Sequence, residues 1–92
     1  MYHKLFQIIE DKAARNDEID DAIIKLADYP NAEVIEFLIE VSYQGPEDYI
    51  LSSIGETMAE IFLKEKGLLN QYREQINSLP KIVLKEINVF LN

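Results

Sequence analysis

Residues 32–43 read Ala-Glu-Val-Ile-Glu-Phe-Leu-Ile-Glu-Val-Ser-Tyr, and the spacing of their apolar side chains predicts a helix. Apolar residues cover most of the circumference of this helix. Its polar residues, spaced i, i+3, i+7 and i+10, leave only a narrow stripe: Glu33, Glu36, Glu40 and Tyr43. A helix that is apolar on so many sides is packed by neighbours on more than one face. We therefore expect residues 32–43 to form the central helix of an all-α protein.

The flanking sequence continues the helical spacing on both sides. Further helices are predicted at about residues 2–15, 17–29, 47–66, 68–78 and 80–91. Pro30, Gly45-Pro46, Gly67 and Pro80 separate them, with Asn16 or Asp17 as the cap of the second helix and Asn31 as the cap of the third. The last segment is rich in β-branched residues, so a strand is its alternative. The short turns favour one domain, 1–92, with about six antiparallel helices in a short helical-pair solenoid or a compact helical bundle.

Each flanking helix has one apolar face, which we assign to the core. The assigned residues are Tyr2, Leu5, Phe6, Ile9 and Ala13; Ile19, Ala22, Ile23, Leu26 and Ala27; Ile50, Leu51, Ile54, Met58, Ile61 and Phe62; Leu69, Tyr72 and Ile76; and Val83, Leu84, Ile87 and Phe90. Gly55 and Ala59, four residues apart, form a smooth patch on the helix predicted at 47–66. Another helix can approach closely there, either within the chain or from a second copy.

Negative charge is concentrated in one part of the sequence. Twelve carboxylates stand between Asp17 and Glu60, where the only cation is Lys25. This acidic block has a net charge of −11 and the remaining residues sum to +3, which together give the formal net charge of −8. The first-turn carboxylates of the helix predicted at 17–29 are stabilised by the helix dipole. The rest of the block creates a potential that attracts a basic partner and repels nucleic acid and anionic lipid.

The chain has few residues suited to catalysis. His3 is the only histidine, there is no cysteine, and the sequence contains no nucleophile elbow, phosphate-binding glycine loop or zinc-protease motif. Asp17, Asp20 and Asp21 lack the alternating ligands and central glycine of a calcium loop, so we interpret them as helix-capping acids. We expect a protein that is not an enzyme and has no cofactor, metal or small-molecule substrate.

Two segments resemble the HEAT repeat, a paired-helix unit. Residues 26–34, Leu-Ala-Asp-Tyr-Pro-Asn-Ala-Glu-Val, look like the turn between its two helices, and residues 45–50 are similar. Residues 54–61 look like the inner helix of such a repeat. The sequence departs from the pattern at Ile35, where a basic residue is usual, and at Ile54, where alanine is usual. The resemblance covers about 17–66 and implies that the flanking helices act as caps.

The run at 48–61 also resembles small bacterial HEAT-like immunity proteins of contact-dependent inhibition and related polymorphic-toxin systems. Such proteins bind and neutralise a cognate toxin domain in the cytoplasm. The resemblance implies an inhibitor of a toxin domain. The acidic residues indicate that this domain is basic, as expected of a nuclease whose own substrate is polyanionic. The alternative is a HEAT-like adaptor that binds another protein without inhibiting a toxin. A cytoplasmic protein agrees with the absence of cysteine and of a signal-peptide-like or membrane-spanning apolar run.

The predicted partner-binding surface combines two polar stripes and the turn between their helices. Its residues are Glu33, Glu36, Glu40, Tyr43, Glu47, Asp48, Tyr49, Ser52, Glu56 and Glu60. In a HEAT-like pair the inner helices lie side by side, so we expect both stripes to merge into one acidic face. Tyrosines beside carboxylates are typical of interface hot spots. The alternatives are a solvated helix face for the carboxylates and core packing for the tyrosines.

Overall fold

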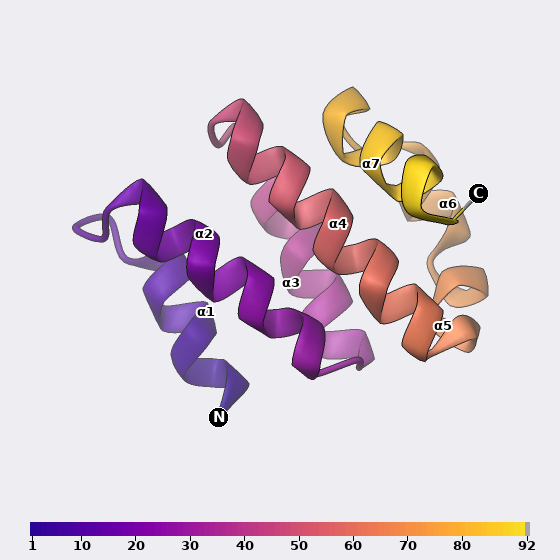
Figure 1. Ribbon diagram of the computed structural model, residues 1–92, viewed down its shortest axis with the longest axis horizontal. Coiled ribbons are helices and arrows are strands. Elements are labelled where there is room, and N and C mark those ends of the chain that lie inside the picture. Colours follow the sequence, from indigo (N-terminus) through magenta and orange to yellow (C-terminus); the bar gives the residue numbers. More distant parts are fainter. Residues whose placement is uncertain (92) are drawn as a thin grey trace.

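The computed structural model describes residues 1–91, and every regular element in that range is helical (Figure 1). The α-helices are α1 (Tyr2–Glu10), α2 (Asn16–Lys25), α3 (Ala32–Ser42), α4 (Asp48–Lys64), α5 (Lys66–Gln71), α6 (Arg73–Asn77) and α7 (Lys81–Leu91), and the short 3₁₀ turn η1 (Leu26–Asp28) follows α2. The predicted all-α fold is confirmed. The last segment is the helix α7, so the strand alternative is wrong.

The helices form two layers. Figure 1 shows α2, α4 and α7 in the nearer layer, with α1 and α3 more distant. Ring stacking of Phe6 on Phe37, at a centroid distance of 3.9 Å, joins α1 to α3 within the distant layer. The shortest dimension of the molecule is 18 Å, which is about twice the 8–10 Å separation of packed helix axes. Most of the core therefore lies between the layers.

The central helix is α4, which corrects the expectation for residues 32–43. Helix α4 packs against α2, α3, α5 and α7. It buries nine residues, whereas α3 buries five. Phe37 and Ile39 of α3 are only half-buried. Helix α3 is apolar around most of its circumference, but the short helices beside it leave some of its apolar side chains partly exposed.

The patch at Gly55 and Ala59 is covered by α7. A β-carbon built on Gly55 would lie 2.6 Å from Cβ of Glu86 and 2.8 Å from the carbonyl oxygen of Val83. Ala59 is fully buried. The predicted close helix approach is therefore confirmed, and it occurs within the chain.

Several helix ends follow from local hydrogen bonds. Asn31 caps α3 as predicted, because its Oδ1 accepts a hydrogen bond from the backbone N–H of Val34 at 3.0 Å. Helix α2 begins differently from the prediction: the backbone N–H of Arg15 donates to Oε1 of Glu18 at 3.0 Å. Helix α1 ends at Glu10 because the Asp11 carboxylate accepts from the backbone of Ala13 at 2.9 Å, a turn that competes with the helix.

Four other expectations about helix extent and burial are wrong. Ala13 lies in the turn after α1 and is exposed. Helix α4 ends at Lys64, and Gly67 lies inside α5 and does not stop a helix. The helix predicted at 68–78 is divided at Tyr72, whose backbone leaves the helical region at φ −109°, ψ 15°. Phe90 is 50% exposed, because α7 turns its buried side, Val83 and Ile87, towards α4 and the core.

Candidate functional site

The polar stripe of α3 is exposed, but most of its side chains already bind neighbouring helices. Glu33 accepts hydrogen bonds from the Tyr2 hydroxyl at 2.5 Å and from Nε2 of His3 at 3.1 Å. The Tyr2 hydrogen bond, followed by that of His3, lowers the pKa of Glu33, and the same carboxylate raises the pKa of Tyr2. Glu33 therefore holds the first turn of α1 against α3.

The other end of the α3 stripe contacts the segment that contains α5 and α6. The Tyr72 hydroxyl donates to the Glu36 carboxylate, and this bond raises the pKa of Tyr72 to about 12. The Tyr43 hydroxyl donates to the backbone carbonyl of Ser78 at 2.8 Å. Glu40 makes no comparable contact within residues 1–91. The stripe thus links α3 to α1 at one end and to the α5–α6 segment at the other.

The α4 face has a different composition. We define it as the side of α4 formed by the half-buried Ser52 and the exposed residues Tyr49, Glu56, Glu60 and Leu63. Tyr49 is 50% and Leu63 54% exposed, and Ile24 on the adjacent α2 is 51% exposed. Large apolar side chains therefore stand among carboxylates at this surface. Because Tyr43 and Tyr49 are both exposed, the core-packing alternative for these tyrosines is wrong.

The α3 stripe and the α4 face lie on opposite sides of the molecule. The stripe is opposite the buried residues of α3, and the α4 face is opposite the buried residues of α4. Those buried residues meet between the two layers of Figure 1. The expectation that the stripes merge into one acidic face is wrong, because the two helices pack through the sides that carry no glutamate.

Within residues 1–91, fewer than half of the twelve carboxylates in the acidic block have a basic side chain nearby. Arg15 pairs with Asp17 and Glu18, Lys25 with Asp21, Lys64 with Glu60, and His3 with Glu33. All of these pairs are exposed, and such pairs contribute about 0–1 kcal/mol each. Within residues 1–91, no side-chain cation lies within 4.0 Å of the predicted site residues Glu36, Glu40, Glu47, Asp48 and Glu56. All five residues are exposed, although the Glu36 carboxylate also accepts the hydrogen bond from Tyr72.

A hollow of about 370 Å³ adjoins the α4 face where α7 packs on α4. It brings together Asp48, Tyr49 and Ser52, which were predicted as site residues, with Ile82, Lys85 and Glu86 of α7. The three α7 residues were not among the predicted site residues. Gly55 predicts that another helix approaches this side of α4, but the residues around Gly55 do not indicate which helix it is. Glu47 lies apart from this hollow, in a cleft near the turn before α4.

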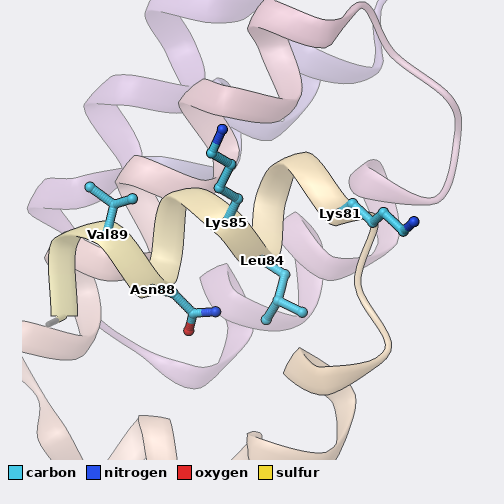
Figure 2. A pocket seen from close by; sticks show the side chains of 5 residues that line it. All are labelled: Lys81, Leu84, Lys85, Asn88 and Val89. Carbon is cyan, nitrogen blue, oxygen red and sulfur yellow. The ribbon is translucent and has the colours of Figure 1, made fainter.

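The exposed side of α7 places basic and apolar groups at one end of the nearer layer. Figure 2 shows Lys85 and Val89 projecting from one side of the helix, and Leu84 and Asn88 from the other. Lys81 begins the same surface. Lys81 and Lys85 lie outside the acidic block, so α7 contributes positive charge at this end of the molecule.

No protein family matches the chain, and no curated protein or solved structure is significantly similar to it. Among residues 1–91, no helix is both long and apolar enough to cross a membrane. Within the same range, no three carboxylate or histidine side chains are grouped so that they could hold a metal ion.

Proposed function

We propose that this protein is an inhibitor of the immunity-protein type, which binds and neutralises a basic toxin domain through the α4 face. The observation that carries the proposal is the composition of that face. Tyr49 and Leu63 are half-exposed beside Glu56 and Glu60, and Glu56 has no cation nearby within the described part of the chain. Protein interfaces commonly combine apolar or aromatic anchors with a charged rim.

The α4 face suits a partner better than the α3 stripe does. On α3, binding by an outside cation would compete with the hydrogen bonds that Glu33 and Glu36 accept from Tyr2 and Tyr72. On the α4 face, the one ion pair that the carboxylates make within residues 1–91 is that of Glu60 with the exposed Lys64 ammonium, at 3.6 Å. A partner can therefore engage α4 without loosening the packing of other helices.

The charge of the protein favours a nuclease as the target. A nuclease binds a polyanion with lysine and arginine side chains, and the carboxylates of the inhibitor can pair with those same groups. The net charge of −8 steers the two proteins together, and burial of Tyr49 and Leu63 would then slow dissociation. The protein would act in the cytoplasm, where such a toxin meets its nucleic-acid substrate.

Affinity capture at low salt with two matched bait variants tests this function. In the first, Glu56→Lys and Glu60→Lys reverse the α4 face; in the second, Glu40→Lys and Glu74→Lys reverse two exposed carboxylates elsewhere. Both variants have a formal net charge of −4, because each reversal adds two positive charges to −8. We expect the wild type and the second variant, but not the first, to retain a basic polypeptide that is released as salt rises.

The captured polypeptide then has to be inhibited. Addition of one equivalent of the wild-type protein should abolish its nucleolytic activity, and the first variant should not. Equal capture by both variants, or capture without inhibition, would contradict the proposal.

An adaptor is the second candidate function, and a groove at the far end of the molecule favours it. The groove, of about 230 Å³, lies between α7 and the α5–α6 segment. Its lining combines the apolar side chains of Leu69, Ile76, Leu84, Ile87 and Leu91 with the polar side chains of Arg73, Asn77 and Asn88. Binding of a peptide there would depend little on salt. Retention of the partner at high salt, with no effect of the α4 reversals, would favour the adaptor.

A further inference from the structure

A cleft lies at the end of the molecule where the turn before α2 meets the turn before α4. Figure 1 shows both turns at the same end of the two layers. Two adjoining hollows, of about 270 and 490 Å³, share the side chains of Ile9, Asn16, Ile19 and Gln44. The cleft is therefore one continuous surface, and it lies outside the α4 face.

The floor of the cleft is apolar and firmly held. Ile9, Val41 and Ile50 are at least nine-tenths buried and belong to the core, and Ile19 is half-buried above them. Side chains fixed by the core keep their positions when a ligand binds, which lowers the entropic cost of binding. The smaller hollow has less volume than most sites for drug-sized molecules, so it suits a single apolar side chain.

The walls carry two side-chain amides with free hydrogen-bonding capacity. Asn16 comes from the start of α2 and Gln44 from the turn before α4, and both are exposed. Within residues 1–91, neither side chain makes a hydrogen bond. A primary amide offers both a carbonyl acceptor and an NH₂ donor, which match the N–H and C=O of a peptide unit. Gly45, at φ +74°, shapes the wall beside Gln44 in a backbone conformation that favours glycine.

The rim of the cleft is acidic. Glu10, Asp11 and Glu47 line it with Lys12 as the one cation among the lining residues, which gives the rim a net charge of −2. The acidic block adds to this potential. A ligand with positive charge next to its apolar group is therefore favoured over a neutral or acidic one.

We propose that this cleft binds a short peptide segment in which a branched apolar side chain is flanked by basic residues. The apolar side chain contacts Ile19 and the floor, Asn16 and Gln44 hydrogen-bond the peptide main chain, and Glu10 and Glu47 face the basic side chains. The proposal does not rest on the function assigned to the α4 face. It identifies a second surface, with its own ligand chemistry.

Nuclear magnetic resonance titration with defined peptides tests the site. The probes are the capped peptides Gly-Lys-Leu-Lys-Gly, Gly-Lys-Ser-Lys-Gly and Gly-Glu-Leu-Glu-Gly, added to the full chain labelled with ¹⁵N. We expect only the first to give saturable shifts, and we expect them at the backbone amides of Asn16, Ile19 and Gln44. Shifts of equal size with the serine peptide would overturn the role of the apolar floor. Shifts of equal size with the glutamate peptide would overturn the role of the acidic rim.

Variants then separate the site from non-specific attraction. Asn16→Ala with Gln44→Ala should weaken binding of the leucine peptide by roughly tenfold or more, because two hydrogen bonds are lost. Gln7→Ala with Gln75→Ala removes two exposed amides elsewhere and should leave binding unchanged. Equal affinities of the wild type and both double variants for the leucine peptide would overturn the proposal. Chemical-shift changes confined to α4 would also overturn it. The variant Glu56→Lys/Glu60→Lys should still bind the peptide, so failure of the proposed inhibitor function would be seen separately.

Discussion

At the scale of single residues, hydrogen bonds between distant parts of the chain decide how the acidic side chains of α3 are used. Glu36 and Tyr72 are far apart in sequence, yet the Tyr72 hydroxyl donates to the Glu36 carboxylate at the boundary between α3 and the α5–α6 segment. The hydroxyl donates this hydrogen bond only while it is protonated. Loss of the bond on ionisation, followed by burial of the side chain and repulsion from the carboxylate, raises the pKa of Tyr72 to about 12. The folded state therefore favours neutral Tyr72.

The sign of the resulting pH dependence follows from this raised pKa. Neutral Tyr72 stabilises the fold fully below its unfolded pKa of 10.0, and that contribution is lost as the pH rises from 10 through about 12. In Glu36→Gln the amide oxygen accepts a weaker hydrogen bond than the carboxylate does, and it carries no charge. We expect the pKa of Tyr72 to fall towards 10 in this variant, measured from the Tyr72 ring resonances. Glu40→Gln is the control and should leave that pKa unchanged; an equal effect of both variants would contradict the contact.

At the scale of elements, the contact between α4 and α7 depends on one missing side chain. Backbone atoms of Val83 and the Cβ of Glu86 occupy the space that a β-carbon on Gly55 would need. A flexible side chain could move aside, but the carbonyl of Val83 belongs to the backbone of α7. Any side chain at position 55 therefore has to displace the whole helix.

Substitution of Gly55 should reveal how much this contact stabilises the protein. We expect Gly55→Ala to lower the free energy of unfolding by about 1–3 kcal/mol, even though alanine is the better helix former. Urea unfolding followed by circular dichroism measures the change. Gly67→Ala is the matched control, since nothing lies within 4 Å of its β-carbon, and it should change stability by no more than about 1 kcal/mol. A Gly55→Ala variant as stable as wild type would disprove the close approach.

At the scale of the whole molecule, the uneven charge opposes folding. The formal net charge is −8, and the ion pairs that offset repulsion within the described chain are few and exposed. Folding brings the carboxylates of α2, α3 and α4 into a molecule only 35 × 27 × 18 Å in size. Self-repulsion of this kind destabilises a compact state and is screened by salt.

Salt should therefore stabilise the isolated protein while it weakens the proposed complex. We expect Tm to rise by a few degrees between low salt and about 1 M NaCl, where the Debye length is about 3 Å. Differential scanning calorimetry measures this rise. The variant Glu56→Lys/Glu60→Lys has half the net charge of the wild type, so its Tm should rise less with salt. A Tm that falls with salt in the wild type would show that attractive ion pairs dominate the folded state.

The positions of the helices were more predictable from the sequence than the contacts of the site residues. Helix α3 was placed closely, because its apolar spacing and its Asn31 cap act within a few residues. The end of α1 was missed because one Asp11 hydrogen bond outweighed a continuing helical pattern. The exposure of Tyr49 and the links of Glu36 could not be predicted, since both depend on which neighbours α3 and α4 acquire.

The sequence by itself determined the helical fold class, most of the core residues and the concentration of negative charge, because each depends on composition or on spacing within one turn of helix. Tertiary structure alone decided that α4 is central, that α7 covers Gly55 and that the α3 stripe and the α4 face point in opposite directions. It also decided that two separate turns meet to form the cleft. The physical reason is that a helix can bury its apolar side against several neighbours, and only packing of the whole chain selects among them.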